Sequence, residues 1–146
     1  MQKSLLQKLA FGYFLLFISV VSLNYIPTIH DDQEMMFGLF KLDLIDDILH
    51  LLTAIWALVA GFYSFGAARF YFRAFGIFYA LDGVLCTIFG QCLADFTLFT
   101  HSHEITFLST GNLMERLLLN GPHMVIGGLA IYFGFGLSRR LRGLHD

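Results

Sequence analysis

The stretch LDLIDDILHLL places carboxylates and an imidazole at the start of a long apolar run. Its polar members are Asp43, Asp46, Asp47 and His50. In a helix, Asp46 and His50 share one face, because residues four apart are neighbours on the helix surface. Carboxylate and imidazole ligands together suit Zn²⁺ and similar divalent cations. Another histidine, His123, begins a further apolar run, and two histidines on facing helices could instead ligate a haem.

An architectural role fits the same residues. Asp47-x-x-His50 recurs as Asn120-x-x-His123, and Asp and Asn are both favoured as helix N-cap residues. Each histidine would then lie in the first turn, where the helix dipole keeps an imidazole neutral and able to hydrogen-bond to a neighbouring helix or loop. Capping is the simplest interpretation, and a metal site stays open. Haem is disfavoured because acidic surroundings would repel its propionates.

A single carboxylate, Asp82, lies inside the third apolar run, about nine residues after Arg73 and so near the middle of a bilayer. A carboxylate at that depth is costly and indicates function, here proton or cation handling. The alternative is a protonated Asp82 that hydrogen-bonds to a backbone carbonyl or to the hydroxyl of Tyr79, Thr87 or Ser19. The lack of an intramembrane basic partner favours that alternative.

The segment THSHE adds two more histidines. His101 and His103 share a face if the chain is extended there. Together with His50 and His123 they could complete a metal site. A solvated loop tip is the alternative.

Composition places all these residues in a membrane protein. The 146 residues are 57% hydrophobic and 14% charged, against about 25% charged in soluble domains. Four apolar runs are long enough to cross a bilayer as helices, which takes roughly 20 residues. They cover about 5–26, 48–68, 70–94 and 122–138. The first is interpreted as a retained span and not a signal peptide, because no A-x-A-like site follows it. We expect one domain, residues 1–146, folded as an all-α, four-transmembrane-helix bundle.

Charges separate to the two sides of this bundle. The basic residues before, between and after the spans on one side are Lys3, Lys8, Arg69, Arg73, Arg139, Arg140 and Arg142. Most acidic residues and five of the six histidines fall on the other side. Cytoplasmic segments are enriched in Lys and Arg, so both termini are predicted to be cytoplasmic, in the inner membrane of a bacterium.

Packing signals run through the spans. AFGYF at 10–14 recurs as AFGIF at 74–78, which with the two histidine motifs predicts two tandem helix–loop–helix repeats. Small residues four apart let helix backbones approach closely. They occur at Ala57/Gly61, Gly76/Ala80 and Ala130/Gly134. Cys86 and Cys92 are six apart, so along one helix they point in different directions and are expected to be free thiols.

Three segments carry a resemblance to a known family. DDILHLLTAIWALVAG, AARFYFRAFGIFYALDG and LNGPHMVIGG together resemble a bacterial family of small four-helix membrane proteins known only as a domain of unknown function. The resemblance implies a four-helix bundle with His50 and His123 at the start of the second and fourth helices, and it implies no activity.

The function expected from these features is non-enzymatic. The sequence has no phosphate-binding Gly-rich loop, no His-Glu-x-x-His, no Gly-x-Ser-x-Gly and no CxxC, and no basic face for nucleic acid. An accessory, lipid-contacting or oligomer-forming bundle is predicted, with the lipid bilayer and a second copy or another membrane protein as partners. The alternatives are a divalent-cation-binding or transport protein, with Zn²⁺ as the first choice, and a haem-binding redox protein.

Overall fold

Helices dominate the computed structural model, which describes residues 3–32, 36–37, 42, 44–89 and 112–142. Within these residues, four helical segments are long and apolar enough to cross a membrane. They are α1 (Leu5–Asn24), α2 (Leu44–Tyr63), α3 (Phe65–Phe89) and a continuous segment formed by α5 (Leu113–Ile131), the π-helical η2 (Tyr132–Leu137) and α6 (Ser138–Arg142). A short 3₁₀ turn, η1 (Pro27–Ile29), follows α1. The predicted all-α, four-span architecture is confirmed.

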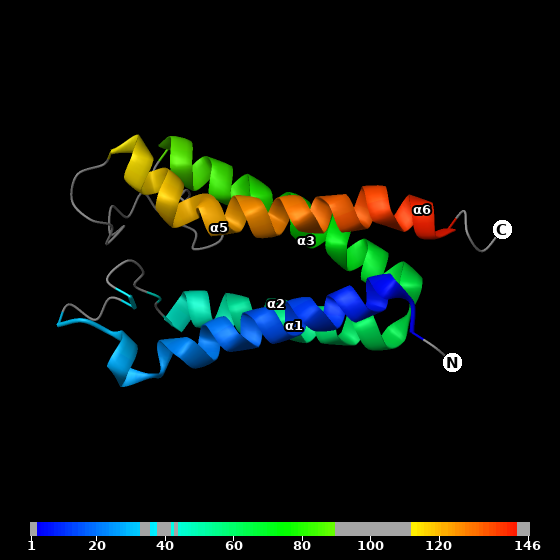
Figure 1. Ribbon diagram of the computed structural model, residues 1–146, viewed down its shortest axis with the longest axis horizontal. Coiled ribbons are helices and arrows are strands. Elements are labelled where there is room, and N and C mark those ends of the chain that lie inside the picture. The colour runs from blue at the N-terminus through cyan, green and yellow to red at the C-terminus, as the bar shows by residue number, and fades with distance from the viewer. Residues whose placement is uncertain (1–2, 33–35, 38–41, 43, 90–111, 143–146) are drawn as a thin grey trace.

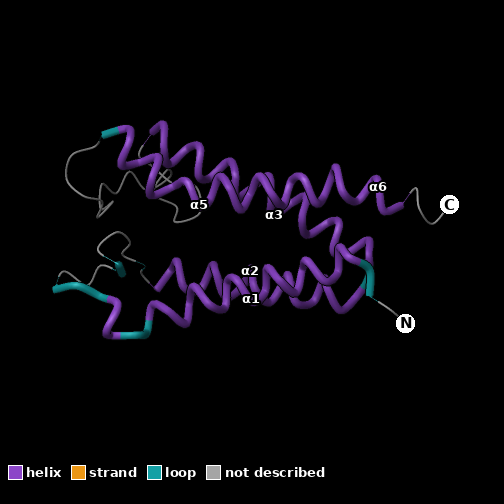
Figure 2. Tube along the Cα trace, in the orientation of Figure 1, coloured by secondary structure: helices purple, strands orange, loops and turns teal. Residues whose placement is uncertain are grey.

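The helices form two antiparallel pairs, α1 with α2 and α3 with α5 (Figure 1). α3 begins beside the first pair and then crosses to α5, so it connects the two pairs. The tube in Figure 2 shows the same path, with α1 beginning and α6 ending at one end of the molecule. α2 and α5 both begin at the opposite end, and they carry the candidate histidines His50 and His123.

Hydroxyl caps set two of the helix boundaries. Ser4 begins α1 with a capping box that it shares with Gln7. Ser64 alone separates α2 from α3, and its hydroxyl accepts a hydrogen bond from the Ala67 backbone N–H at 3.1 Å. The sequence had suggested a boundary at Arg69, where the apolar run is interrupted by charge. Arg69 instead lies inside α3, because a Ser cap satisfies a free backbone donor at a helix start.

Small residues bring α3 and α5 into backbone contact. A Cβ atom added at Gly127 would lie 2.4 Å from the Ala80 backbone nitrogen, and one at Gly76 would lie 2.7 Å from the Ile131 nitrogen. A Cβ added at Gly134 would meet Phe72 and Arg73 at 2.8–3.0 Å. The predicted packing role of the small residues is confirmed here, since only glycine permits these approaches.

Aromatic rings fill the space where α1 meets α3 and α5. Tyr13, Phe17, Tyr71, Phe72 and Phe75 are all buried. The Tyr13 ring stands edge-on to its neighbours, a favourable geometry for the aromatic quadrupole. Its hydroxyl donates to the Ile126 backbone carbonyl at 2.8 Å. This bond ties α1, in the first helix pair, to α5, in the second pair.

The widened turn η2 is held by side chains around one carbonyl. Arg73 Nε and the Ser138 hydroxyl both donate to the Gly134 carbonyl, at 2.8 Å and 2.6 Å. The Arg73 guanidinium also lies 4.4 Å from the centre of the Phe135 ring. A π segment interrupts the regular backbone ladder, and these donors satisfy the carbonyl at that point.

The cysteine prediction is wrong for Cys86. The structure has Cys86 in a disulfide, with its partner outside the described residues. The expectation of free thiols assumed one helix running through both cysteines to residue 94. The described part of α3 ends at Phe89, and Cys92 lies outside the described residues.

Candidate functional site

The two histidine motifs lie inside helices and not at their caps. α2 begins at Leu44, so Asp47 stands within its first turn and not at the N-cap. α5 begins at Leu113, and its cap is Asn112, whose side chain accepts from the Met114 N–H at 3.0 Å. Asn120 is two turns further along and donates to the Arg116 carbonyl at 2.9 Å. The predicted N-cap roles of Asp47 and Asn120 are therefore wrong.

The sequence pointed to the wrong start of α5 because of Pro122. Proline is favoured in the first turn of a helix and disfavoured inside one. Here α5 continues through Pro122. Transmembrane helices tolerate an internal proline, since neighbouring groups can satisfy the backbone carbonyl that it leaves free.

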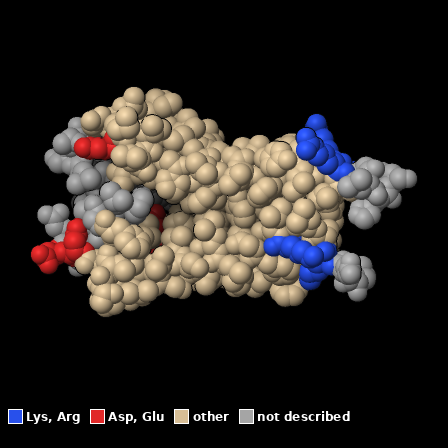
Figure 3. All heavy atoms as spheres, viewed as in Figure 1, with Lys and Arg blue, Asp and Glu red and all other residues tan. Residues whose placement is uncertain are grey.

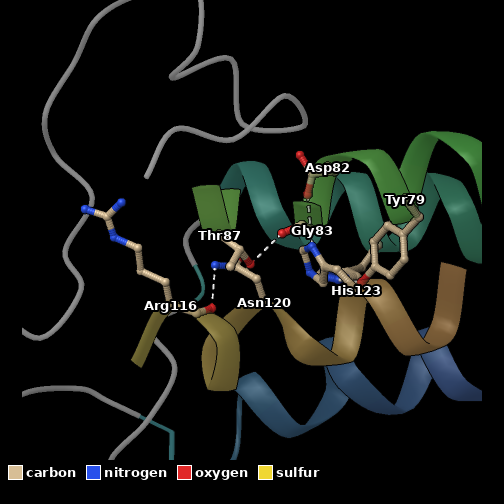
Figure 4. A network of polar contacts seen from close by, with 8 residues as sticks. Tyr79, Asp82, Gly83, Thr87, Arg116, Asn120 and His123 are labelled. Carbon is tan, nitrogen blue, oxygen red and sulfur yellow. Dashed lines mark hydrogen bonds and ion pairs between the residues drawn. The ribbon is translucent and has the colours of Figure 1, made fainter. Parts of the chain in front are cut away.

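Asp82 has a basic partner on another helix. Its side chain is fully buried, and its Oδ2 lies 2.9 Å from Nδ1 of His123 (Figure 4). The expectation that Asp82 lacks an intramembrane basic partner is wrong. The approach depends on Gly83, where an added Cβ would come within 2.8 Å of the His123 Cβ. A carboxylate in the membrane interior is costly unless paired, and the imidazole supplies that pairing.

A chain of polar rings continues from this pair to α2. The Tyr79 ring lies against His123, with centroids 4.2 Å apart. The Tyr79 hydroxyl is 3.4 Å from Nε2 of His50, and the His50 ring stacks on Phe17 at 5.6 Å. Asp82, His123, Tyr79 and His50 thus form a continuous cluster that joins α3, α5 and α2.

One atom of this cluster lacks a partner. His50 is buried, and its Nδ1 meets no partner with hydrogen-bond geometry among the described residues. Buried nitrogens without partners are uncommon and costly, and each calls for an explanation.

The cluster faces a cavity of about 370 Å³ between α2, α3 and α5. Its polar or partly polar lining residues are Asp46, His50, Thr53, Tyr79 and His123. Its apolar lining residues are Leu49, Trp56, Ala74, Phe75 and Phe78. The space-filling view shows the molecule hollowed between the two helix pairs, toward the end that carries its acidic residues (Figure 3). Cavities of this size and lining are typical of small-molecule sites.

Asp47 belongs to a separate contact at the same end. Its Oδ2 accepts a hydrogen bond from Asn24 Nδ2 at 2.9 Å, which ties α2 to the end of α1. Hydrogen bonding to the Asp47 carboxylate raises the pKa of Tyr25. Asp47 does not line the cavity, unlike its neighbour Asp46.

The full set of proposed metal ligands is only partly described. Asp43, His101 and His103 lie outside the described residues. Among the residues that the structure does describe, no three His, Cys, Asp or Glu side chains gather closely enough to hold a metal ion. The structure brings Asp46, His50 and His123 to one cavity.

Sequence reasoning missed the aromatic part of the site. Trp56, Phe75 and Phe78 line the cavity and were counted only among the apolar residues of the spans. The sequence does contain a pattern that points to these residues, because the α2 lining residues recur at helical spacing from Asp46 to Trp56. That spacing marks one face of α2, but it does not show whether the face meets lipid, protein or a cavity.

Comparison with known proteins gives a family and no function. The description "Domain of unknown function (DUF4383)" matches residues 7–117. The match covers α1, α2 and α3 and ends before His123. No curated protein and no solved structure matches the chain. Since the match spans well over half of the sequence, the chain belongs to this family of unknown function, DUF4383.

Proposed function

We propose that this protein is a non-enzymatic membrane protein that binds a membrane-soluble amphiphile in the cavity between α2, α3 and α5. The observation that carries the proposal is a cavity of about 370 Å³ lined by aromatic and aliphatic side chains with a few polar groups. Ligand sites commonly combine such an apolar wall with a few placed polar groups that orient the ligand.

The polar groups of the lining favour one orientation of the ligand. On α2, Asp46 and His50 come first and Trp56 comes last. Trp56 lies ten residues after Asp46, which is a rise of about 15 Å at 1.5 Å per residue. An amphiphile would therefore place its polar head near the start of α2 and its apolar part toward the middle of the membrane.

A cavity-filling variant tests the proposal. The wild-type protein is purified in mild detergent, and retained amphiphiles are extracted and quantified by mass spectrometry. Ala74→Phe puts a ring into the cavity, whereas Ile77→Phe, also on α3, adds one at an exposed position outside the lining. The wild type and Ile77→Phe should retain about one amphiphile per chain, and Ala74→Phe should lose it. Equal retention in the two variants would refute the proposal.

The same preparation tests the cation and haem alternatives. Asp46, His50 and His123 line one cavity, but these three described side chains do not gather closely enough to hold a metal ion as they lie. If the wild type retains one divalent cation per chain and both His50→Ala and His123→Ala lose it, the ligand is a metal ion and not an amphiphile. If the wild type shows a Soret band and the same two variants lose it, the ligand is haem.

We also propose that the protein resides in a bacterial inner membrane with both termini cytoplasmic. Most of the described basic residues gather at the end where α1 begins and α6 ends (Figure 3), and Arg116 near the start of α5 is the exception. Segments enriched in Lys and Arg are retained in the cytoplasm. Cys86 lies toward the other end of α3, and its disulfide suits an oxidising compartment.

Cysteine labelling tests this orientation. Asp32 and Arg140 are exposed at opposite ends of the molecule. In intact cells, a membrane-impermeant maleimide should label Asp32→Cys, and it should label Arg140→Cys only after the membrane is permeabilised. The parent protein gives the background, and the reverse pattern would invert the topology.

A further inference from the structure

Arginines from two helices gather at the end of the bundle where α3 begins and α6 ends. On α3, Arg69 and Arg73 are four residues apart. On α6, Arg139 and Arg142 are three residues apart. Residues at these spacings share one face of a helix. Each helix therefore presents two guanidinium groups on one side, and together these four residues form an arginine cluster.

A close contact between the helices sets the two pairs of arginines beside each other. Arg73 Nε donates to the Gly134 carbonyl at 2.8 Å, and a Cβ added at Gly134 would meet the Arg73 backbone nitrogen at 2.8 Å. α3 and the segment from α5 to α6 run in opposite directions (Figure 1). One turn toward the end of the molecule, Arg69 on α3 therefore lies about level with Ser138, which is fully buried. Arg142 follows Ser138 by four residues, so it continues the face of α6 that packs on the bundle.

The positive charges of the arginine cluster are not balanced by described carboxylates. Arg69 lies within reach of the positive charges of the other three members. Within the described residues, none of the four forms an ion pair with a carboxylate, and the acidic side chains visible in Figure 3 lie toward the other end. The start of α3 adds a positive helix end, with no acidic residue in its first turn. Like charges held together repel one another, and a bound anion would offset that repulsion.

The guanidinium ends of the cluster are open to a ligand. Arg139 and Arg142 are exposed. Arg69 is half-buried; its Nε is enclosed by protein, whereas its two terminal nitrogens are neither enclosed nor hydrogen-bonded within the described residues. The terminal N–H groups of these three side chains are thus the available donors. Paired guanidinium N–H groups match the oxygens of a phosphate in both geometry and charge.

We propose that the arginine cluster binds the phosphate group of an anionic ligand. This site is separate from the cavity and does not rest on the proposed function. An acidic phospholipid is the favoured source of the phosphate. Tyr63, at the end of α2, is exposed, and tyrosines at the end of a span are typical of the headgroup level of a membrane. Phe70, next to Arg69, is also exposed and offers an apolar surface to an acyl chain. Basic clusters between spans at that level bind acidic headgroups. A soluble phosphate from the aqueous phase shares the same chemistry.

Native mass spectrometry of the full chain in dodecyl maltoside tests the proposal. The protein is titrated with an equal mixture of phosphatidylglycerol and phosphatidylcholine that carry identical acyl chains. Both lipids have a phosphate, but only phosphatidylglycerol has a net negative headgroup. The wild type should bind its first phosphatidylglycerol at least about tenfold more tightly than phosphatidylcholine, because each nearby Lys or Arg contributes about fivefold to the binding of an acidic lipid. This comparison requires no variant.

Matched variants separate the arginine cluster from surface charge in general. Arg69→Gln and Arg142→Gln should each weaken the binding of phosphatidylglycerol about fivefold. Arg140→Gln removes the same charge from an exposed position on α6, but Arg140 is not among the charges that act on Arg69. It should therefore change the binding by less than about twofold, since salt screens exposed charges outside the site. Equal losses in Arg140→Gln and Arg142→Gln would overturn the inference, because the attraction would then come from surface charge alone.

A second measurement identifies the source of the phosphate. Thermal unfolding of the wild type and of Arg142→Gln is followed by circular dichroism, with either phosphatidylglycerol or millimolar inorganic phosphate added. A ligand that binds the folded state raises the melting temperature. If the source is a lipid, phosphatidylglycerol should raise the melting temperature of the wild type more than that of Arg142→Gln, and inorganic phosphate should not. A rise with inorganic phosphate that Arg142→Gln loses would assign the cluster to a soluble phosphate. If neither ligand raises the melting temperature and the wild type shows no preference for phosphatidylglycerol, the inference is overturned.

Discussion

Two adjacent glycines on α5 should respond in opposite ways to the same substitution. In Gly127→Ala, the new Cβ would lie 2.4 Å from the backbone nitrogen of Ala80, 2.8 Å from its Cα and 2.9 Å from its Cβ. In Gly128→Ala, the new Cβ would have no neighbour within 4 Å. The pair therefore measures how much of the stability depends on the close approach of α3 and α5.

The expected magnitude follows from these distances. Ordinary contact begins near 3.4 Å, so Gly127→Ala must separate α3 and α5 locally by about 1 Å. The atoms that it meets are backbone atoms and a Cβ, which cannot rotate away. Overpacking of this kind costs about 1–3 kcal/mol, and we expect the upper part, about 2–3 kcal/mol. That corresponds to a roughly 30- to 150-fold change in the unfolding equilibrium constant.

Unfolding in mixed micelles of dodecyl maltoside and SDS, followed by circular dichroism, gives the free energies of unfolding. Gly128→Ala should be neutral or stabilise by up to about 1 kcal/mol, because alanine favours the helix over glycine. In Gly127→Ala, the ¹⁵N signals of His123, one turn away, should also shift as its contact with Asp82 lengthens. A loss below about 0.5 kcal/mol for Gly127→Ala, or an equal loss for Gly128→Ala, would refute the reasoning.

Three further predictions concern polar contacts. A double-mutant cycle with Asp82→Asn and His123→Gln should give a coupling free energy of about 1–2 kcal/mol in the same unfolding assay. A coupling near zero would show that the contact between the two side chains does not stabilise the fold. Arg73→Lys should destabilise by about 1 kcal/mol, because an ammonium cannot reproduce both the Nε bond to Gly134 and the planar stacking, whereas an unchanged melting temperature would show that η2 needs neither. Tyr13→Phe should cost about 0.6 kcal/mol by loss of its bond to α5, and a larger loss with altered helix content would mean that the hydroxyl is needed for folding.

The spans and the separation of charge could be predicted from the sequence. Apolar length decides whether a segment crosses a bilayer, and this is a local property that α1, α2 and α3 each carry. The position of helix ends was less certain. Ser64, and not the charged Arg69, separates α2 from α3, and α5 begins at its Asn112 cap well before Pro122. The internal repeat stays a prediction.

The site itself depends on contacts between residues far apart in the chain. The sequence by itself determined that Asp82 is intramembrane and that His50 and His123 belong to two different spans. Only the tertiary structure decided that His123 reaches Asp82 past Gly83, and that Tyr79 holds one nitrogen of His50 while leaving the other unpaired. The physical reason is that hydropathy fixes the depth of a residue along its helix, whereas the rotation and spacing of helices follow from side-chain packing between them. Those two quantities determine which polar groups meet inside the membrane.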